Sequence, residues 1–308
     1  MTATPTNSDP KSLAAELLHP LPLGRTWFTY GMTAIAFGLT GLALIPLLAI
    51  LIEILRQGLP HLTPEVFVSL PAPAGVTDVP NGFANAILGT LIMVTIATLL
   101  SIPFGVMTGI FLSELGRGAA ASGPVQTVAS FVRFIATILS GVPSIIAGVF
   151  AWGVIVQTMK GFSALAGGFA LAIIMLPIVT LTTEEALKLV PDSQRLASAA
   201  LGANRRQTTF RIAVTSALSG ITTGILLAVA RAAGETAPLL FTALGSLTWP
   251  DGLLKPAPSL SVLIFNYSQS PFVEQTELAW TASAVLVGLV LLTSILSRFF
   301  TRRRLKIR

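Results

Sequence analysis

The chain of 308 residues is 53% hydrophobic and only 10% charged, and it carries a net charge of +6. Because soluble proteins carry about 25% charged residues, this composition excludes an ordinary soluble domain and indicates an integral membrane protein. The absence of cysteine excludes disulfides and thiolate metal sites, and two histidines leave little for a histidine-based site. We therefore expect no enzyme activity, no bound metal and no cofactor in this chain.

The basic residues cluster at the ends of apolar runs, which is typical of a membrane protein and not of one that binds nucleic acid. Residues 1–27 are polar and lack the short apolar core and cleavage site of a signal peptide, so we expect a retained tail. Residues 28–56 follow as the first apolar run. A helix over this run is long enough to cross a hydrocarbon core of about 30 Å.

Four charge-free intervals further along the chain, and one apolar interval that contains a single charge pair, predict five more membrane-spanning helices. They lie within residues 86–111, 134–159, 161–183, 216–242 and 278–297. A basic tail, residues 301–308, follows the last of them. The sequence thus predicts an all-α integral membrane protein with six spans.

The distribution of lysine and arginine sets the predicted orientation. With the N-terminus in the cytoplasm, that side collects most of the basic residues, and the opposite side keeps only Arg56, Lys160 and Lys255. Basic residues favour the cytoplasmic side of a membrane, so both termini are expected inside. The outer loops, residues 57–82 and 245–277, are rich in proline and are expected to form turns and short surface helices.

The third and fourth predicted spans contain features that disturb a helix. Pro143 and Pro177 each remove a backbone donor, which predicts a kink; a static kink and a hinge both remain open. Arg133 is expected at the cytoplasmic start of the third span, either as an anchor at the helix end or as a contact for solute. Ser144, next to Pro143, is a candidate contact on the same path.

Residues 184–215 are too polar to cross a membrane. Asp192 is placed to begin a helix, Gly202 to end it, and Asn204 to cap a second helix that leads into the fifth span. An ordinary solvated loop is one interpretation, and a segment that docks into a soluble partner is the other. The candidate docking residues are Arg195, Leu196, Ala197, Ser198, Gly202, Ala203, Arg205 and Arg206.

Arg231 and Glu235 are the two charges within the fifth predicted span, in the stretch "ARAAGETAPLLFTA" (230–243). Charged residues at the centre of a membrane helix cost about 2.5–3.5 kcal/mol each and usually face a bundle interior or a water-filled path. Their spacing of four residues places them on one face of a helix, where they can pair. A lock between helices and a contact for a passing solute are the two interpretations.

Three other stretches accompany this one: "NAILGTLIMVTIATLLSIPFGVMTGIFLSEL" (85–115), "LSGVPSIIAGVF" (139–150) and "LPIVTLTTEEALKLVP" (176–191). In combination, the four resemble the PstA-type permease family of bacterial phosphate importers. The resemblance covers residues 83–300 and implies the six-helix, MetI-like fold of type I ABC importers. It also implies a place in the bacterial inner membrane.

The resemblance implies partners as well. They are a PstC-type sibling permease, two PstB-type ATP-binding subunits at the cytoplasmic face and a PstS-type phosphate-binding protein at the outer face. Arg231 would then bind phosphate through its planar fork of donors, with Glu235 as a competitor that keeps binding transient. The chain lacks the G-x-x-x-x-G-K-[ST] motif, so ATP and magnesium would be used by the partner ATPase.

Segment 184–215 resembles the EAA loop of ABC importer permeases, which sits in a cleft of the ATPase subunit. Aligned on Gly202, however, the glutamate and the proline of the general motif are absent. Two alternatives stay open at this point. One is a permease for another oxyanion, such as phosphonate, molybdate or sulfate; the other is a secondary transporter or channel that works without ATP.

Overall fold

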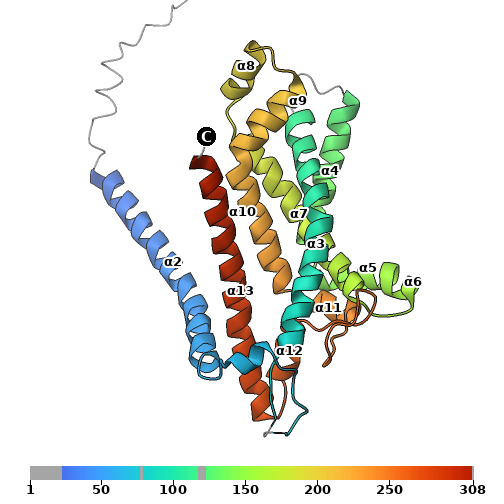
Figure 1. Ribbon diagram of the computed structural model, residues 1–308. Coiled ribbons are helices and arrows are strands. Elements are labelled where there is room, and N and C mark those ends of the chain that lie inside the picture. The colour runs from blue at the N-terminus through green and yellow to red at the C-terminus, as the bar shows by residue number, and fades with distance from the viewer. Residues whose placement is uncertain (1–22, 77–78, 117–122, 307–308) are drawn as a thin grey trace, which may run out of the picture. The chain divides into compact units, whose positions relative to one another are not determined.

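The computed structural model describes residues 23–76, 79–116 and 123–306, and these residues form helices joined by loops, with one isolated β-bridge, between Leu244 and Ala257 (Figure 1). Most of the predicted N-terminal tail and the last two residues of the basic tail lie outside these ranges. Six of the described helices are long and apolar enough to cross a membrane. The prediction of an all-α protein with six spans is confirmed.

The chain divides into two units, residues 1–53 and 54–308. The described part of the first unit is most of helix α2 (Leu23–Gly58). Most of its apolar side chains are exposed, including Trp27, Phe37 and Ile50. An apolar helix of this length can cross a membrane.

The second unit holds the other five spans. They are α3 (Ala84–Ile110), α4 (Gly123–Gly141), α7 (Ala164–Lys188), α10 (Val214–Ala233) and α13 (Val273–Lys306). Helix α3 continues through the π-helix η2 (Phe111–Leu115). In Figure 1 the bundle carries α8 (Asp192–Ala200) at one end and α12 (Leu260–Ser268) at the other, called here the α8 end and the α12 end.

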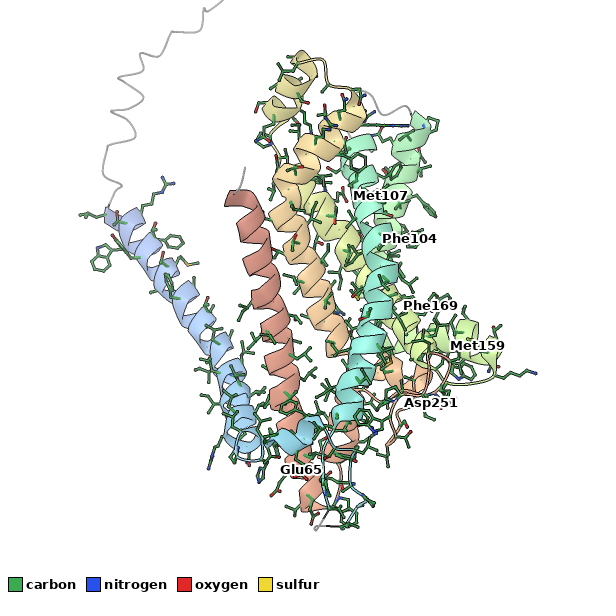
Figure 2. The ribbon with its side chains drawn as sticks, viewed as in Figure 1. Glu65, Phe104, Met107, Met159, Phe169 and Asp251 are labelled. Carbon is green, nitrogen blue, oxygen red and sulfur yellow. The ribbon has the colours of Figure 1, made fainter. Side chains whose placement is uncertain are left out.

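Helix α7 is the centre of this bundle and its most buried span. Small residues of α3 let the two helices pack at close range: Gly105 lies against Val179, and Gly109 lies against Thr183. Glycines that let two helix backbones approach closely are typical of helix pairs in membranes. On α3, by contrast, Phe104 and Met107 are 66% and 58% exposed and project outward (Figure 2).

Replacing Gly109 with alanine is expected to destabilise the bundle. The added Cβ would lie 2.6 Å from Thr183 Cβ, and overpacking of this kind costs about 1–3 kcal/mol. Gly288→Ala is the matched control, because nothing lies within 4 Å of that position in α13 and alanine favours a helix. We expect thermal unfolding in detergent to show a lower midpoint for Gly109→Ala alone. Equal midpoints for the two variants would contradict the close packing of α3 on α7.

The third predicted span, residues 134–159, is wrong. Helix α4 begins at Gly123 and ends at Gly141, and Pro143 lies in the break before α5 (Ser144–Ala151), not inside a span. The π-helix η3 (Trp152–Val156) and α6 (Gln157–Met159) continue α5, which runs across the direction of α4 (Figure 1). Proline lacks the backbone donor that would have continued α4.

The fifth predicted span, residues 216–242, is also interrupted. Helix α10 ends at Ala233, and α11 (Ala237–Thr242) begins after a three-residue turn that contains Gly234 and Glu235. Proline at 238 suits the first turn of α11, where its missing N–H has no helical partner to bind. Pro177, in contrast, is buried inside α7, which continues to Lys188.

The α12 end is closed by loops and short helices, as expected for the proline-rich segments. Glu65 belongs to the 3-10 helix η1 (Pro64–Phe67) and lies at this end (Figure 2). The amide of Asn85, which is fully buried, donates to the carbonyls of Ser246 and Thr248 and so ties the long loop to α3. At the same end, a separate hydrophobic core forms around Phe83 and Leu260.

Candidate functional site

A cavity of about 410 Å³ opens where α4 ends and α5 begins. Helix α7 and the last turn of α10 complete its wall. The lining residues are Leu139, Ser140, Val142, Ile146, Ala147, Phe150, Ile173, Ile174, Leu176, Ile178 and Arg231. Apart from the hydroxyl of Ser140 and the guanidinium of Arg231, these side chains are apolar. An apolar cavity with a few polar groups is the usual form of a binding site for a small solute.

Arg231 supplies the charge of this cavity. Its Nε lies 3.3 Å from Oε1 of Glu235, so the two charges contact each other as their spacing predicted. The continuous helix expected between them is wrong, because α10 ends at Ala233 and Glu235 lies in the turn. A cation in the last turn of a helix is stabilised by the negative end of the helix dipole.

The pair leaves much of the guanidinium available. Only Nε bonds to Glu235, and among the described residues neither Nη group of Arg231 has a hydrogen-bond partner. The side chain of Arg231 is 48% exposed and that of Glu235 is 14% exposed. The backbone carbonyl of Glu235 accepts a bond from the hydroxyl of Ser261, which fixes the turn. The turn that carries Glu235 is therefore fixed, while both Nη groups of Arg231 can reach a ligand.

Helix α5 forms the floor of the cavity and is packed on α11. Gly148 permits this contact, since a Cβ there would lie 2.6 Å from Cα of Pro238. Ser144 begins α5 and is half-buried, but it is not among the lining residues. Ser140, one turn before it on the chain, lines the cavity instead and was missed because the sequence did not reveal where α4 ends.

Arg133 lies at the middle of α4 rather than at its start. Its Nε and Nη2 donate to Oε1 of Glu184 at 2.9 and 2.7 Å. Lys188 Nζ approaches the same oxygen at 2.9 Å, and the Glu184 side chain is only 1% exposed. The expected anchor at the helix end is thus wrong: Arg133 forms an ion pair between α4 and α7, which offsets the cost of a charge within a span.

Segment 184–215 folds as a helix, a glycine turn and a second helix, as its sequence predicted. Helix α8 begins at Asp192, and Gly202 adopts the left-handed conformation with φ of +79°. Asn204 caps α9 (Arg205–Gln207) by accepting from the backbone of Gln207, whose side chain accepts from the backbone of Asn204. The π-helix η4 (Thr208–Ala213) then leads into α10.

Two arginines of this segment form hydrogen bonds to other residues of the chain. Arg195 Nη2 lies 2.8 Å from Oε1 of Glu114, in η2, and also donates to the carbonyl of Leu187. Arg205 donates to the carbonyl of Glu114. Sequence reasoning missed Glu114, whose partner lies 81 residues away. Arg195 is mostly buried: its side chain is 20% exposed, and it fastens α8 to the ends of α3 and α7.

Other residues of the segment divide between the interior and the surface. Ser198 is buried, with its hydroxyl 3.0 Å from that of Thr208, while Ala203 lines a second cavity of about 780 Å³ beside α8. Ala197 and Arg206 are exposed.

Three leucines in or beside α8 are exposed. Leu196 is 69% exposed, and Leu189 and Leu201, which sequence reasoning missed, are 84% and 90% exposed. Leucines in an otherwise polar segment were the feature of the sequence that could have identified these residues.

Comparisons with known proteins agree on one family. The family described as "Binding-protein-dependent transport system inner membrane component" matches residues 82–306. The phosphate transport system permease protein PstA of Yersinia pestis is 41% identical over 252 residues, which cover 82% of each chain. The protein of the same name from Haemophilus influenzae is 40% identical over 258 residues, or 83% of this chain and 87% of the relative.

A solved structure extends the likeness to the fold. A chain of the MetNI methionine ABC transporter, in an inward-facing conformation, superposes with a TM-score of 0.58 at 20% identity. The match covers 71% of this chain and 94% of that one. The predicted fold of a type I ABC importer permease is confirmed.

Proposed function

The chain belongs to the family of binding-protein-dependent transport inner membrane components, and we propose that it is the permease subunit of an ATP-driven importer for inorganic phosphate. The names of relatives at 40% and 41% identity support phosphate as the solute. The six apolar helices agree with a multi-pass protein of the inner membrane. Both termini and the α8 end face the cytoplasm in this proposal, as the distribution of basic residues predicts.

The single observation that carries phosphate binding is the place of Arg231 in the 410 Å³ cavity. A guanidinium offers paired N–H donors that match the oxygens of a phosphate, and its charge persists at any physiological pH. In the surrounding apolar wall, these bonds are stronger than in water. Glu235 competes for the same guanidinium, so the bound anion can leave again.

In this proposal, the energy for transport comes from ATP hydrolysis by partner subunits. Two PstB-type subunits would hydrolyse ATP, since the sequence has no phosphate-cradling GK[ST] loop. Their contact would be α8 with the exposed leucines Leu189, Leu196 and Leu201. A PstC-type sibling would complete the wall of the path, and a PstS-type protein would deliver phosphate at the α12 end.

Radiolabelled phosphate uptake into proteoliposomes tests the proposal. With the four kinds of subunit assembled, uptake is expected only when ATP is supplied on the side of the ATPase subunits. An excess of unlabelled phosphate should abolish uptake of the label, whereas equal concentrations of sulfate or molybdate should not. Uptake that persists without ATP would contradict the importer, and efficient competition by sulfate would contradict phosphate as the preferred solute.

A further inference from the structure

Two arginine–glutamate pairs flank the cavity. Arg231 and Glu235 lie in its wall or beside it, and Arg133 and Glu184 lie further toward the α8 end. On α4, Arg133 precedes the lining residue Ser140 by seven residues. Seven residues span about 10 Å along a helix and return to nearly the same face. The second pair is thus placed one step beyond the cavity, along the direction in which phosphate must travel.

Arg133 keeps part of its guanidinium available. Both of its bonds to Glu184 use Nε and Nη2, and within the described residues Nη1 donates to no partner. The side chain is 35% exposed, although Glu184 is 1% exposed. One side of the guanidinium therefore remains accessible while the other holds the buried carboxylate.

Lys188 makes the release of Arg133 feasible. A buried carboxylate that loses its only cation is destabilised by several kcal/mol, which would keep a simple pair closed. Here Lys188 Nζ already lies 2.9 Å from the same Oε1 of Glu184. If Arg133 turns away, Glu184 keeps a cation partner, and the charge of the interior stays balanced.

We propose that Arg133 is a second anion-binding station, which receives phosphate after Arg231 while Lys188 holds Glu184. This inference rests on the proposed function, since it assigns a further site on the same path. The two stations share one design, a guanidinium with a competing carboxylate. Each binds the anion only transiently, because its own glutamate reclaims the arginine. The phosphate thereby moves between cations without crossing an apolar gap unpaired.

The test uses a variant that removes the pair and leaves Lys188 its exposed partner Glu185. In R133M/E184M two apolar side chains replace the ion pair, a change that is often neutral or stabilising for folding. We expect the maximal rate of ATP-dependent phosphate uptake per assembled complex to fall about tenfold or more, the value of one lost charge-assisted bond. The phosphate concentration for half-maximal uptake should not change, because capture occurs upstream. A folded R133M/E184M complex with the wild-type maximal rate would overturn the second station.

Lys188→Met is the second variant, and it keeps the bond between Arg133 and Glu184. If Arg133 must leave Glu184 to bind phosphate, the rate of uptake should fall, because Glu184 then has no second cation. If Arg133 and Glu184 only hold α4 against α7, the rate should not change. Glu185→Gln is the matched control, since it removes the exposed partner of Lys188 and is expected to leave uptake unchanged. If R133M/E184M fails to assemble, slow uptake by Lys188→Met supports the station and wild-type uptake overturns it. Absence of ATP-dependent uptake in the wild type would instead refute the proposed function itself.

Discussion

Arg231→Gln is expected to abolish phosphate uptake while the assembled importer still hydrolyses ATP. The substitution removes the charge of the cavity, and two charge-assisted hydrogen bonds at about 1.5–3 kcal/mol each correspond to a loss of at least a hundredfold. Arg231→Lys should retain part of the activity, because an ammonium keeps the charge but lacks the planar fork. Initial rates of radiolabelled phosphate uptake, divided by the amount of complex, measure both effects.

Glu235→Gln separates binding from release. Without the competing carboxylate, Arg231 should hold phosphate more tightly, and uptake should saturate at a lower phosphate concentration and a lower maximal rate. The ATPase activity of each variant controls for assembly, since α8 lies at the other end of α10 from Arg231. Wild-type uptake by Arg231→Gln would contradict the role of the arginine, and wild-type uptake by Arg231→Lys would contradict the bidentate contact.

Glu114→Gln is expected to uncouple ATP hydrolysis from transport. Glu114 holds Arg195 of α8 at 2.8 Å, and Arg195 also donates to the backbone carbonyls of Leu187 and Val190. This one arginine thus joins α8 to the ends of α3 and α7. Since both side chains are mostly buried, the loss of the carboxylate should weaken the joint by about 1–3 kcal/mol. Movement of α8 would then reach the spans incompletely.

The measurement is the number of phosphate ions transported per ATP hydrolysed, which should fall severalfold in Glu114→Gln. Asp192→Asn is the matched control: Asp192 also contacts Arg195, at 3.2 Å, but its side chain is 91% exposed. Exposed pairs contribute about 0–1 kcal/mol, so the ratio should stay near that of the wild type. Equal ratios in wild type and Glu114→Gln would show that α8 transmits its movement without this joint.

Local sequence signals predicted four of the six spans and the helix–turn–helix of segment 184–215. The hydrophobic runs were sufficient for α2, α3, α7 and α13, because a membrane helix is specified mainly by its length and its lack of charge. The turn at Gly202 and the cap at Asn204 were likewise local, since each depends on neighbouring residues. The contact of Arg231 with Glu235 was predicted as well, although the argument from spacing assumed a continuous helix and Glu235 lies in the turn after α10.

The errors arose where distant residues decide the structure. The start of α4 was misplaced because Arg133 was taken as a boundary, whereas Glu184, 51 residues away, neutralises it inside the helix. The role of Glu114 was not predicted for the same reason, since its partner Arg195 lies in α8. The cavity itself depends on where α4 and α10 end and on how α5 packs against α11, and no periodicity in the sequence encodes these relations.

The most direct test of the path is a structure of the assembled importer, trapped during turnover with phosphate or with arsenate as an electron-dense analogue. We predict anion density within hydrogen-bonding distance of the Arg231 guanidinium in at least one conformational state, with Glu235 displaced from it. A guanidinium that points into lipid, or that is sealed in a dry subunit interface in every state, would contradict the account.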